Sequence, residues 1–270
     1  MGCQNKRNEA TWIHYNSILA DRGILQPALT PDRIIESEVQ KFTLDTVVSG
    51  LNVPWGMAFL PNVDMLISER SGSLYLFSGG KLSEPVEGLP SIMATGQGGL
   101  LDIALHPEYD SNGWIYFSYS YLNEGGSGPK GNTAIMRARL EGNRLVDQQV
   151  LFKGEPATDR NYHFGCKMAF DGKGHIFFGI GDRGQHFDFP QKLDNHNGKI
   201  HRLNDDGSIP ADNPFVNTQE AMASIRSYGH RNPQGTCFDP LTGELWVSEH
   251  GPRQVNARIM YQDINRGIKL

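Results

Sequence analysis

The stretch that decides the fold spans residues 161–184 and reads NYHFGCKMAFDGKGHIFFGIGDRG. Between its two apolar runs, Asp171-Gly172-Lys173-Gly174 predicts a tight hairpin turn, because glycine supplies positive φ. His163 directly precedes the first run and is expected at the mouth of a strand, a rigid and open position for a general base. The same position also suits a histidine that only closes a strand end. The apolar residues recur at every second position, as in a half-buried strand: Met168, Phe170, Ile176, Phe178 and Ile180.

The composition limits the class of protein. The chain has 270 residues, 20% charged and 38% hydrophobic, and can form one domain if it is all-β. The net charge of −5 offers no basic field for nucleic acid or anionic lipid. No apolar run reaches the roughly 18 residues of a transmembrane helix. Cys3, Cys166 and Cys237 are too few and too scattered for a disulfide framework or a zinc site.

Residues 1–41 are expected to form a leader or a loosely ordered segment. Met1-Gly2-Cys3 is followed by a polar run with no apolar core, so the chain as printed shows no signal peptide. A short helix is predicted over residues 31–39. Thr30 suits its N-cap, Pro31 its first turn, and Asp32 the positive end of its dipole.

From residue 42 onward one pattern recurs: a small residue, an apolar strand, a turn with Pro or Asp, and a second apolar strand. Such a repeat predicts an all-β fold of the β-propeller type, with about four blades over residues 42–252. An irregular sandwich would not explain the repetition. Residues 253–270 lack the pattern and are expected to be an atypical C-terminal tail. The equivalent apolar positions, 46, 65 and 68 residues apart, are Phe59, Leu105, Phe170 and Phe238.

Three segments rich in glycine or proline stand where the repeats begin, and each alone is most often just a turn. Gln97 lies among glycines that let backbone and ligand approach closely. Arg231, beside Asn232 and a fixed turn, suits a bidentate clamp on a carboxylate. The carbonyls of the segment Glu249-His250-Gly251-Pro252 suit a hard cation. Together with His163 they suit an anionic cofactor held with Ca²⁺.

A series of motifs runs through residues 42–252 in this order: VPWGMAFLP, ISERSGSLYLF, GQGGLLDIALHPEY, HFG, FDGKGHIFFGIGDRG, GKIHRLNDDGSIPADNPF, GHRNPQG and VSEHGP. Through these motifs the chain resembles the soluble PQQ-dependent aldose sugar dehydrogenases, the glucose/sorbosone dehydrogenase family. The resemblance implies a six-bladed propeller holding PQQ and Ca²⁺ on its top face. It also implies an aldose sugar substrate oxidised at the anomeric hydroxyl to a lactone, an external electron acceptor, and a periplasmic or extracellular location.

The same resemblance implies a role for each candidate residue. His163 is the general base, which takes the proton of the anomeric hydroxyl while hydride passes to PQQ. Gln97 lies on the substrate and cofactor side, and Arg231 and Asn232 contact PQQ. The backbone oxygens of Gly251 and Pro252 are ligands of Ca²⁺, which polarises the quinone as a Lewis acid.

The chain also departs from the family pattern. Tyr162 stands where some glucose-oxidising members have an acidic residue, which bears on the orientation of His163 or on the substrate range. Cys166 and Lys167 replace a hydroxyl residue and an arginine, with small expected effects. The continuation after GPR differs, and the last blades have no counterpart in the printed sequence. The chain, apparently truncated, is therefore expected to bind PQQ poorly or not to fold alone; tight Ca²⁺-dependent PQQ binding in a calorimetric titration would contradict this.

Two other classes of function are considered. A metal-dependent lactonase would need carboxylates at several strand starts. Glu69 and Glu249 are candidates, although both resemble structural repeat residues. A non-catalytic binding propeller is the other alternative. His163, Arg231 and Asn232 argue against it, and the missing last blades argue for it.

Overall fold

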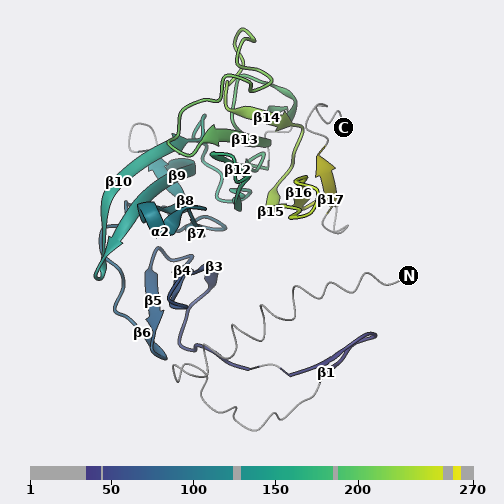
Figure 1. The fold of residues 1–270 in the computed structure, drawn as a ribbon. Helices are drawn as coiled ribbons and strands as arrows, with labels where there is room; N and C mark the ends of the chain where they lie inside the picture. The colour runs from purple at the N-terminus through teal and green to yellow at the C-terminus, as the bar shows by residue number, and fades with distance from the viewer. Residues whose placement is uncertain (1–34, 44, 124–128, 185–187, 252–257, 263–270) are drawn as a thin grey trace.

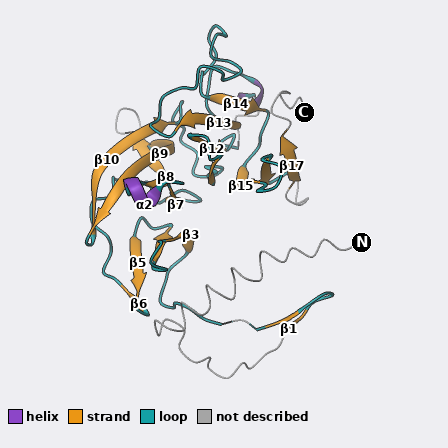
Figure 2. Cartoon of the chain, viewed as in Figure 1, coloured by secondary structure: helices purple, strands orange, loops and turns teal. Residues whose placement is uncertain are grey.

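The computed structural model describes residues 35–43, 45–123, 129–184, 188–251 and 258–262, the last of these as backbone only. Figure 2 shows that the regular structure of this part of the chain is almost entirely β. Four antiparallel sheets of three or four strands follow one another around an arc in chain order (Figure 1). The expected all-β propeller architecture, with about four blades present, is thereby confirmed.

The strands are consecutive within each sheet. The first sheet contains β3 (Pro54–Phe59), β4 (Met65–Glu69), β5 (Leu74–Ser78) and β6 (Lys81–Leu82). The second contains β7 (Leu100–Leu105), β8 (Ile115–Asn123), β9 (Lys130–Glu141) and β10 (Arg144–Lys153). The third contains β11 (Met168–Phe170), β12 (His175–Ile180), β13 (Lys199–Asn204) and β14 (Ile225–Tyr228). The fourth contains β15 (Pro233–Phe238), β16 (Leu245–Glu249) and β17 (Arg258–Gln262). The described residues also contain two short helical turns, α2 (Tyr109–Asn112) and η1 (Phe189–Gln191).

The repeat in the sequence coincides with the sheets. Each of its four marker positions is the last residue of the first strand of one sheet: Phe59, Leu105, Phe170 and Phe238. Strand β17 comes from the segment 253–270, which the sequence pattern described as a tail, and it pairs antiparallel with β16. The fourth sheet therefore extends past residue 252.

The core lies between neighbouring sheets, as in a propeller. Strand β12 shows this clearly. Phe178 packs with residues of the second sheet, whereas Phe177 faces the other way and packs against Leu245 and Val247 of the fourth sheet. Both side chains are at most 5% exposed. The alternation of Ile176, Phe178 and Ile180 thus marks one buried face of a strand whose two faces are both covered.

The prediction of a helix over residues 31–39 is wrong for residues 35–39, the part of this range that the structure describes. Ile35–Glu36 (β1) pairs antiparallel with Lys41–Phe42 (β2). The Ser37 hydroxyl donates to the carbonyl of Gln40 and accepts its N–H, at 2.9 and 3.0 Å, which closes a turn. Serine competes for backbone groups in this way and so disfavours a helix interior. Residues 31–34 and the Met1-Gly2-Cys3 start lie outside the described residues.

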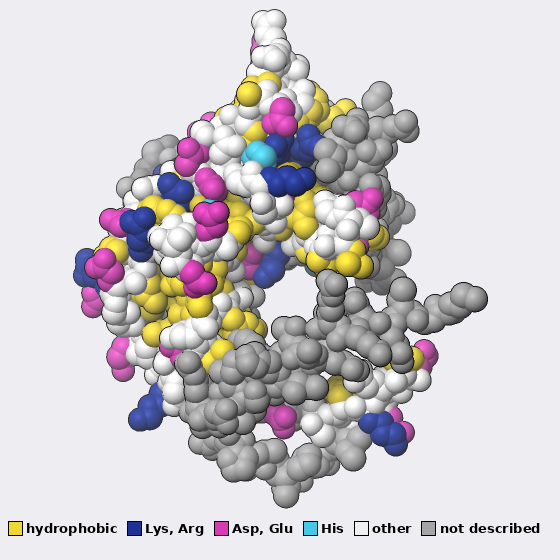
Figure 3. All heavy atoms as spheres, in the orientation of Figure 1, with side chains coloured by type: hydrophobic (Ala, Val, Ile, Leu, Met, Phe, Trp, Pro, Cys, Tyr) yellow, Lys and Arg dark blue, Asp and Glu magenta, His cyan; other side chains and the backbone are white. Residues whose placement is uncertain are grey.

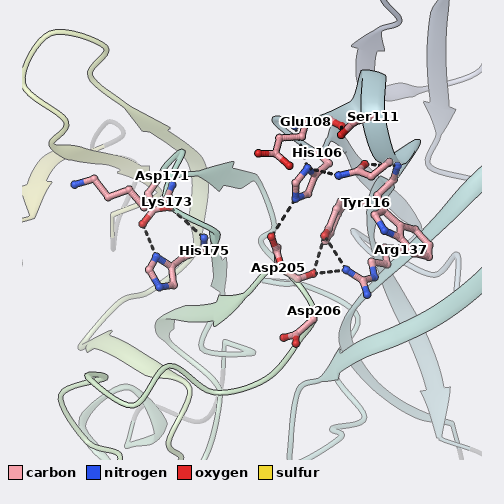
Figure 4. Close-up of polar contacts among 12 residues, drawn as sticks. His106, Glu108, Ser111, Tyr116, Arg137, Asp171, Lys173, His175, Asp205 and Asp206 are labelled. Carbon is pink, nitrogen blue, oxygen red and sulfur yellow. Dashed lines mark hydrogen bonds and ion pairs between the residues drawn. The ribbon is translucent and has the colours of Figure 1, made fainter.

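The hairpin turn predicted at residues 171–174 is confirmed, with φ of +68° at Gly172 and +86° at Gly174. The Asp171 carboxylate accepts the backbone N–H of Lys173 at 2.8 Å and that of His175 at 3.1 Å (Figure 4). This turn and His106, which follows β7, lie at the ends of the first strands.

At that same end, side chains of the second sheet bind a turn of the third. His106 Nε2 contacts the Asp205 carboxylate at 3.1 Å, and the Tyr116 hydroxyl donates to the Asp205 carbonyl at 2.6 Å (Figure 4). Arg137 donates to the same carbonyl at 3.0 Å. Because these contacts cross between sheets, they fix the ends of the first strands relative to each other.

Acidic and basic side chains are interspersed on the face shown in Figure 3, with hydrophobic side chains between them. Among the described residues, no helix has the length and apolar character of a membrane-crossing segment.

Candidate active site

A pocket of about 280 Å³ opens where the first strands of the sheets begin. Loops at the ends of sheet strands are the usual place for binding residues on a rigid scaffold. All four sheets, or the loops leading into and out of their strands, supply its lining: Trp55 and Arg70 from the first, Gly96 and Gln97 from the second, Phe164 and Gly165 from the third, and Asn232, Gln234 and His250 from the fourth.

The first and fourth sheets share one contact, in which a glutamate at the end of the second strand binds the backbone just before the first strand. Glu249 ends β16, is buried, and accepts the backbone N–H of Arg231 at 3.0 Å, two residues before β15. Glu69 ends β4 and accepts the N–H two residues before β3 in the same way. These two carboxylates hold the loops that present Trp55 and Gln234 to the pocket. The interpretation of Glu69 and Glu249 as structural repeat residues agrees with these contacts.

Gln97 lies on the pocket in the loop before β7. Its backbone N–H donates to the carbonyl of Asn161 at 2.7 Å, and its side-chain Oε1 accepts the backbone N–H of His163 at 2.9 Å. A Cβ at the preceding residue, Gly96, would come within 2.2 Å of the Asn161 carbonyl, so only glycine fits there. The Gln97 side chain is thus anchored through its oxygen, and its Nε2 has no hydrogen-bond partner among the described residues.

His163 lies in the loop before β11, beside the pocket residue Phe164 rather than among the lining residues themselves. Its Nδ1 lies 2.6 Å from Oδ1 of Asp182, and its side chain is 12% exposed. A carboxylate at this distance accepts the Nδ1 proton, which leaves Nε2 as the basic nitrogen. The contact therefore selects the tautomer that a general base requires.

Asp182 is itself held in place. Its Oδ1 accepts the backbone N–H of Gly184 at 2.7 Å, and its own N–H donates to the carbonyl of Arg231 at 2.7 Å. The sequence analysis missed this residue. The only local signal was an acidic residue in a glycine-rich turn after a buried strand, and its partner lies 19 positions earlier.

Arg231 and Asn232 lie side by side in the loop before β15, with different roles. Asn232 is 3% exposed and lines the pocket; its Oδ1 accepts N–H groups from Gly165 at 3.3 Å and from Gln234 at 2.9 Å. Within the part of the chain that the structure describes, its Nδ2 has no hydrogen-bond partner. The Arg231 guanidinium donates to the carbonyl of His250 at 3.3 Å, and this residue is not among the lining residues.

The expected Ca²⁺ ligands are only partly visible. Gly251 follows His250 at the pocket, whereas Pro252 lies outside the described residues. Within the described part of the chain, no group of three or more His, Cys, Asp or Glu side chains is arranged to hold a metal ion.

Tyr162, Cys166 and Lys167, the three residues that depart from the family pattern, lie in the same loop as His163. The Tyr162 ring meets the His163 ring edge to face, with 5.1 Å between centroids. Cys166 is fully buried, and burial raises the pKa of its thiol, which stays protonated and inert. Lys167 forms an ion pair with buried Asp102 at 2.5 Å. Burial outweighs this lysine and raises the pKa of Asp102.

The sequence profile of one family, described as glucose / sorbosone dehydrogenase, matches residues 51–260. An aldose sugar dehydrogenase of Escherichia coli (strain K12) is 43% identical over 207 residues, covering 75% of this chain and 55% of that protein. Quinoprotein glucose dehydrogenase B of Acinetobacter calcoaceticus is 32% identical over 251 residues, covering 83% of this chain and 51% of that protein.

Among solved structures, the PQQ-bound form of an aldose sugar dehydrogenase from Streptomyces coelicolor has a TM-score of 0.68 and 30% sequence identity. The match covers 81% of this chain and 62% of that one. The chain spans about half the length of the curated relatives that it matches.

Proposed function

Because the chain belongs to the glucose/sorbosone dehydrogenase family, we propose that its pocket is the PQQ- and sugar-binding site of an aldose sugar dehydrogenase. The observation that carries the proposal is the contact between His163 and Asp182 beside the pocket. A histidine held in this tautomer, with Gln97 bonded to its backbone, is equipped to remove a proton from a ligand.

The residues present fit PQQ, a planar anionic cofactor. Trp55 offers aromatic surface, and Arg70, Gln97 and Asn232 offer N–H donors around the same space. Planar carboxylated ligands favour such a combination of stacking and fixed donors. Arg231 adds a cation beside the pocket, although its guanidinium is bonded to the His250 carbonyl. We propose that Asn232 and Arg231 hold the cofactor, with Gln97 between cofactor and sugar.

In the proposed reaction, PQQ supplies the quinone carbon that accepts a hydride. His163 removes the proton of the anomeric hydroxyl through Nε2 as the C1–H bond breaks, so the sugar loses two electrons and two hydrogens and leaves as a lactone. Asp182 then faces an imidazolium, which its carboxylate stabilises. Gln97 fixes the backbone of His163 and so the distance between the base and the bound sugar.

Ca²⁺ is proposed to bind at the carbonyl oxygens of Gly251 and Pro252, since such oxygens are the ligands that this cation prefers. The proposal extends to an aldose substrate, an external electron acceptor and a periplasmic or extracellular location, which the family membership supports.

The propeller is proposed to run from residue 42 through β17, beyond the limit of 252 that the sequence pattern favoured, because β17 adds a strand to the fourth sheet.

The test is dye reduction by the full chain after reconstitution with PQQ and Ca²⁺, with a panel of aldoses, comparing the wild type with His163→Ala. We expect sugar-dependent reduction that falls at least about 10²-fold in the variant, the usual contribution of a general base. Folded wild-type protein that reduces no dye would contradict the dehydrogenase and favour a binding propeller. Lactone hydrolysis without PQQ would favour a lactonase.

A further inference from the structure

Arg183 is the largest fully buried side chain that the structure describes, and it lies next to Asp182 in the turn after β12. It forms no ion pair with a carboxylate among the described residues, and its NH1 atom is buried without a hydrogen-bond partner. Burial lowers the pKa of its guanidinium to about 9. An arginine in such surroundings costs stability, so its contacts must serve another purpose.

The contacts of Arg183 converge on one short segment. Its guanidinium lies over the Phe164 ring, 3.6 Å from the centroid. Its Nε donates to the Thr158 hydroxyl at 3.2 Å, and its NH2 donates to the carbonyl of Arg160. All three partners belong to residues 158–164, the segment that carries His163. A planar, five-donor cation can make such stacked and hydrogen-bonded contacts at once, and a lysine cannot.

The segment needs such support because His163 has a φ of +58°. A residue other than glycine in this region is strained and stays there only when its surroundings over-determine it. The backbone N–H of His163 is bonded to Gln97, and its imidazole is bonded to Asp182. Arg183 holds the residues on both sides of it, at Arg160 and Phe164.

We propose that Arg183 is a positioning residue whose guanidinium fixes residues 158–164 so that His163 keeps its hydrogen bond to Asp182. The proposal deepens the proposed function, on which it rests only for the role of His163 as base. The turn after β12 then positions His163 in two ways: Asp182 holds its imidazole, and Arg183 holds the backbone segment that carries it.

The test uses the full chain, with ¹⁵N-labelled histidine and no cofactor. It follows the exchange of the His163 Nδ1–H with water by NMR. In Arg183→Lys and Arg183→Met we expect exchange at least about tenfold faster, because the hydrogen bond to Asp182 opens more often. Since lysine keeps the positive charge, a change in both variants separates positioning from a charge effect.

Arg202→Met is the matched control. Arg202 belongs to the same sheet, lies over Phe177 at 5.9 Å, and bonds His175 Nε2 at 2.9 Å near the other end of β12. His175 also has an aspartate on Nδ1, at 2.7 Å. We expect Arg202→Met to change the His175 signals and leave those of His163 as in the wild type.

Thr158→Val removes one acceptor of Arg183 with little change of shape, and it decides the matter if the Arg183 variants do not fold. Faster His163 exchange in Thr158→Val supports the proposal. Unchanged exchange in every variant that folds overturns it, and so does an equal effect of Arg202→Met on His163.

If the wild type reduces dye, Arg183→Lys should lower kcat at least about tenfold with little change in KM. A wild type without activity refutes the proposed function, while the exchange experiment still tests Arg183.

Discussion

The aspartate beside His163 is the residue on which the proposed chemistry depends most. Asp182 accepts from the imidazole and from the backbone N–H of Gly184 through the same oxygen. Asp182→Asn keeps the size but replaces an anionic acceptor with an amide, which no longer stabilises the imidazolium and can select the wrong tautomer. We expect kcat of the reconstituted protein to fall at least about 10²-fold. Steady-state dye reduction measures this, and an unchanged kcat in a variant with wild-type unfolding would rule out the role.

Gly184 leaves room for the ring beside His163. A Cβ there would lie 1.8 Å from Cε2 of Tyr162, and the residue has a φ of +79°. Gly184→Ala should therefore destabilise the protein through both strain and collision and displace the tyrosine. Gly142→Ala is the matched control, because its φ is +59° with nothing within 4 Å of the added carbon.

In urea unfolding, we expect Gly142→Ala to cost about 1 kcal/mol, the penalty of a left-handed residue alone, and Gly184→Ala to cost more. Equal costs for the two substitutions would show that Tyr162 yields without resistance.

Some of the site could be predicted from the sequence and some could not. His163 and Gln97 stand in motifs that single them out locally. Asp182 and Arg183 share a glycine-rich turn that looks like any other, and their importance arises from partners brought to them by folding. Pair contacts between distant segments leave no local pattern, so residue-by-residue inspection misses them.

At the scale of elements, strand β12 is predicted to depend on both of its faces. Phe177 and Phe178 pack against different neighbouring sheets. Each substitution by alanine should lower the free energy of unfolding by about 3–5 kcal/mol. Leu241→Ala, at an 83% exposed position, is the control and should cost less than about 0.5 kcal/mol. A large cost for Phe178→Ala and a small one for Phe177→Ala would mean that the strand is buried on one side only.

The elements themselves were well predicted where turns and apolar runs repeat. All four marker positions end the first strand of a sheet, because the same packing problem recurs in each blade and leaves the same pattern. The exceptions are the short hairpin β1–β2, where a helix was expected, and β17. Within the described residues, the turn that the Ser37 side chain closes favours a hairpin over the continuation of a helix toward residue 39. Strand β17 owes its place to pairing with β16 rather than to a pattern of its own.

At the scale of the whole molecule, contacts between sheets should make the fold sensitive to acid. His196 packs against Phe152 of the second sheet and His201 of the third. Burial lowers the pKa of His196 from 6.5 to about 4. Between these two values the unfolded chain binds a proton that the folded chain does not, so stability is lost as the pH falls through this window and is unaffected above it.

We expect the free energy of unfolding to fall by roughly 3 kcal/mol from this residue between pH 6.5 and pH 4. His196→Asn keeps an acceptor for the backbone N–H of Glu155, which the wild-type Nδ1 binds at 2.9 Å. Urea titrations across this pH range should show a shallower decline in the variant. An identical decline would assign the acid sensitivity to other groups.

The pocket belongs to no single sheet. Each of the four sheets contributes to its lining, while in the described part of the chain the core clusters join sheets that are neighbours along the arc. The width of the pocket therefore depends on how each sheet is oriented relative to the next one. A conservative swap deep in an intersheet core, such as leucine for methionine, would turn one blade slightly and reshape the opening without touching a bound molecule. The shape of the opening can therefore change through substitutions at packing residues that do not line the pocket.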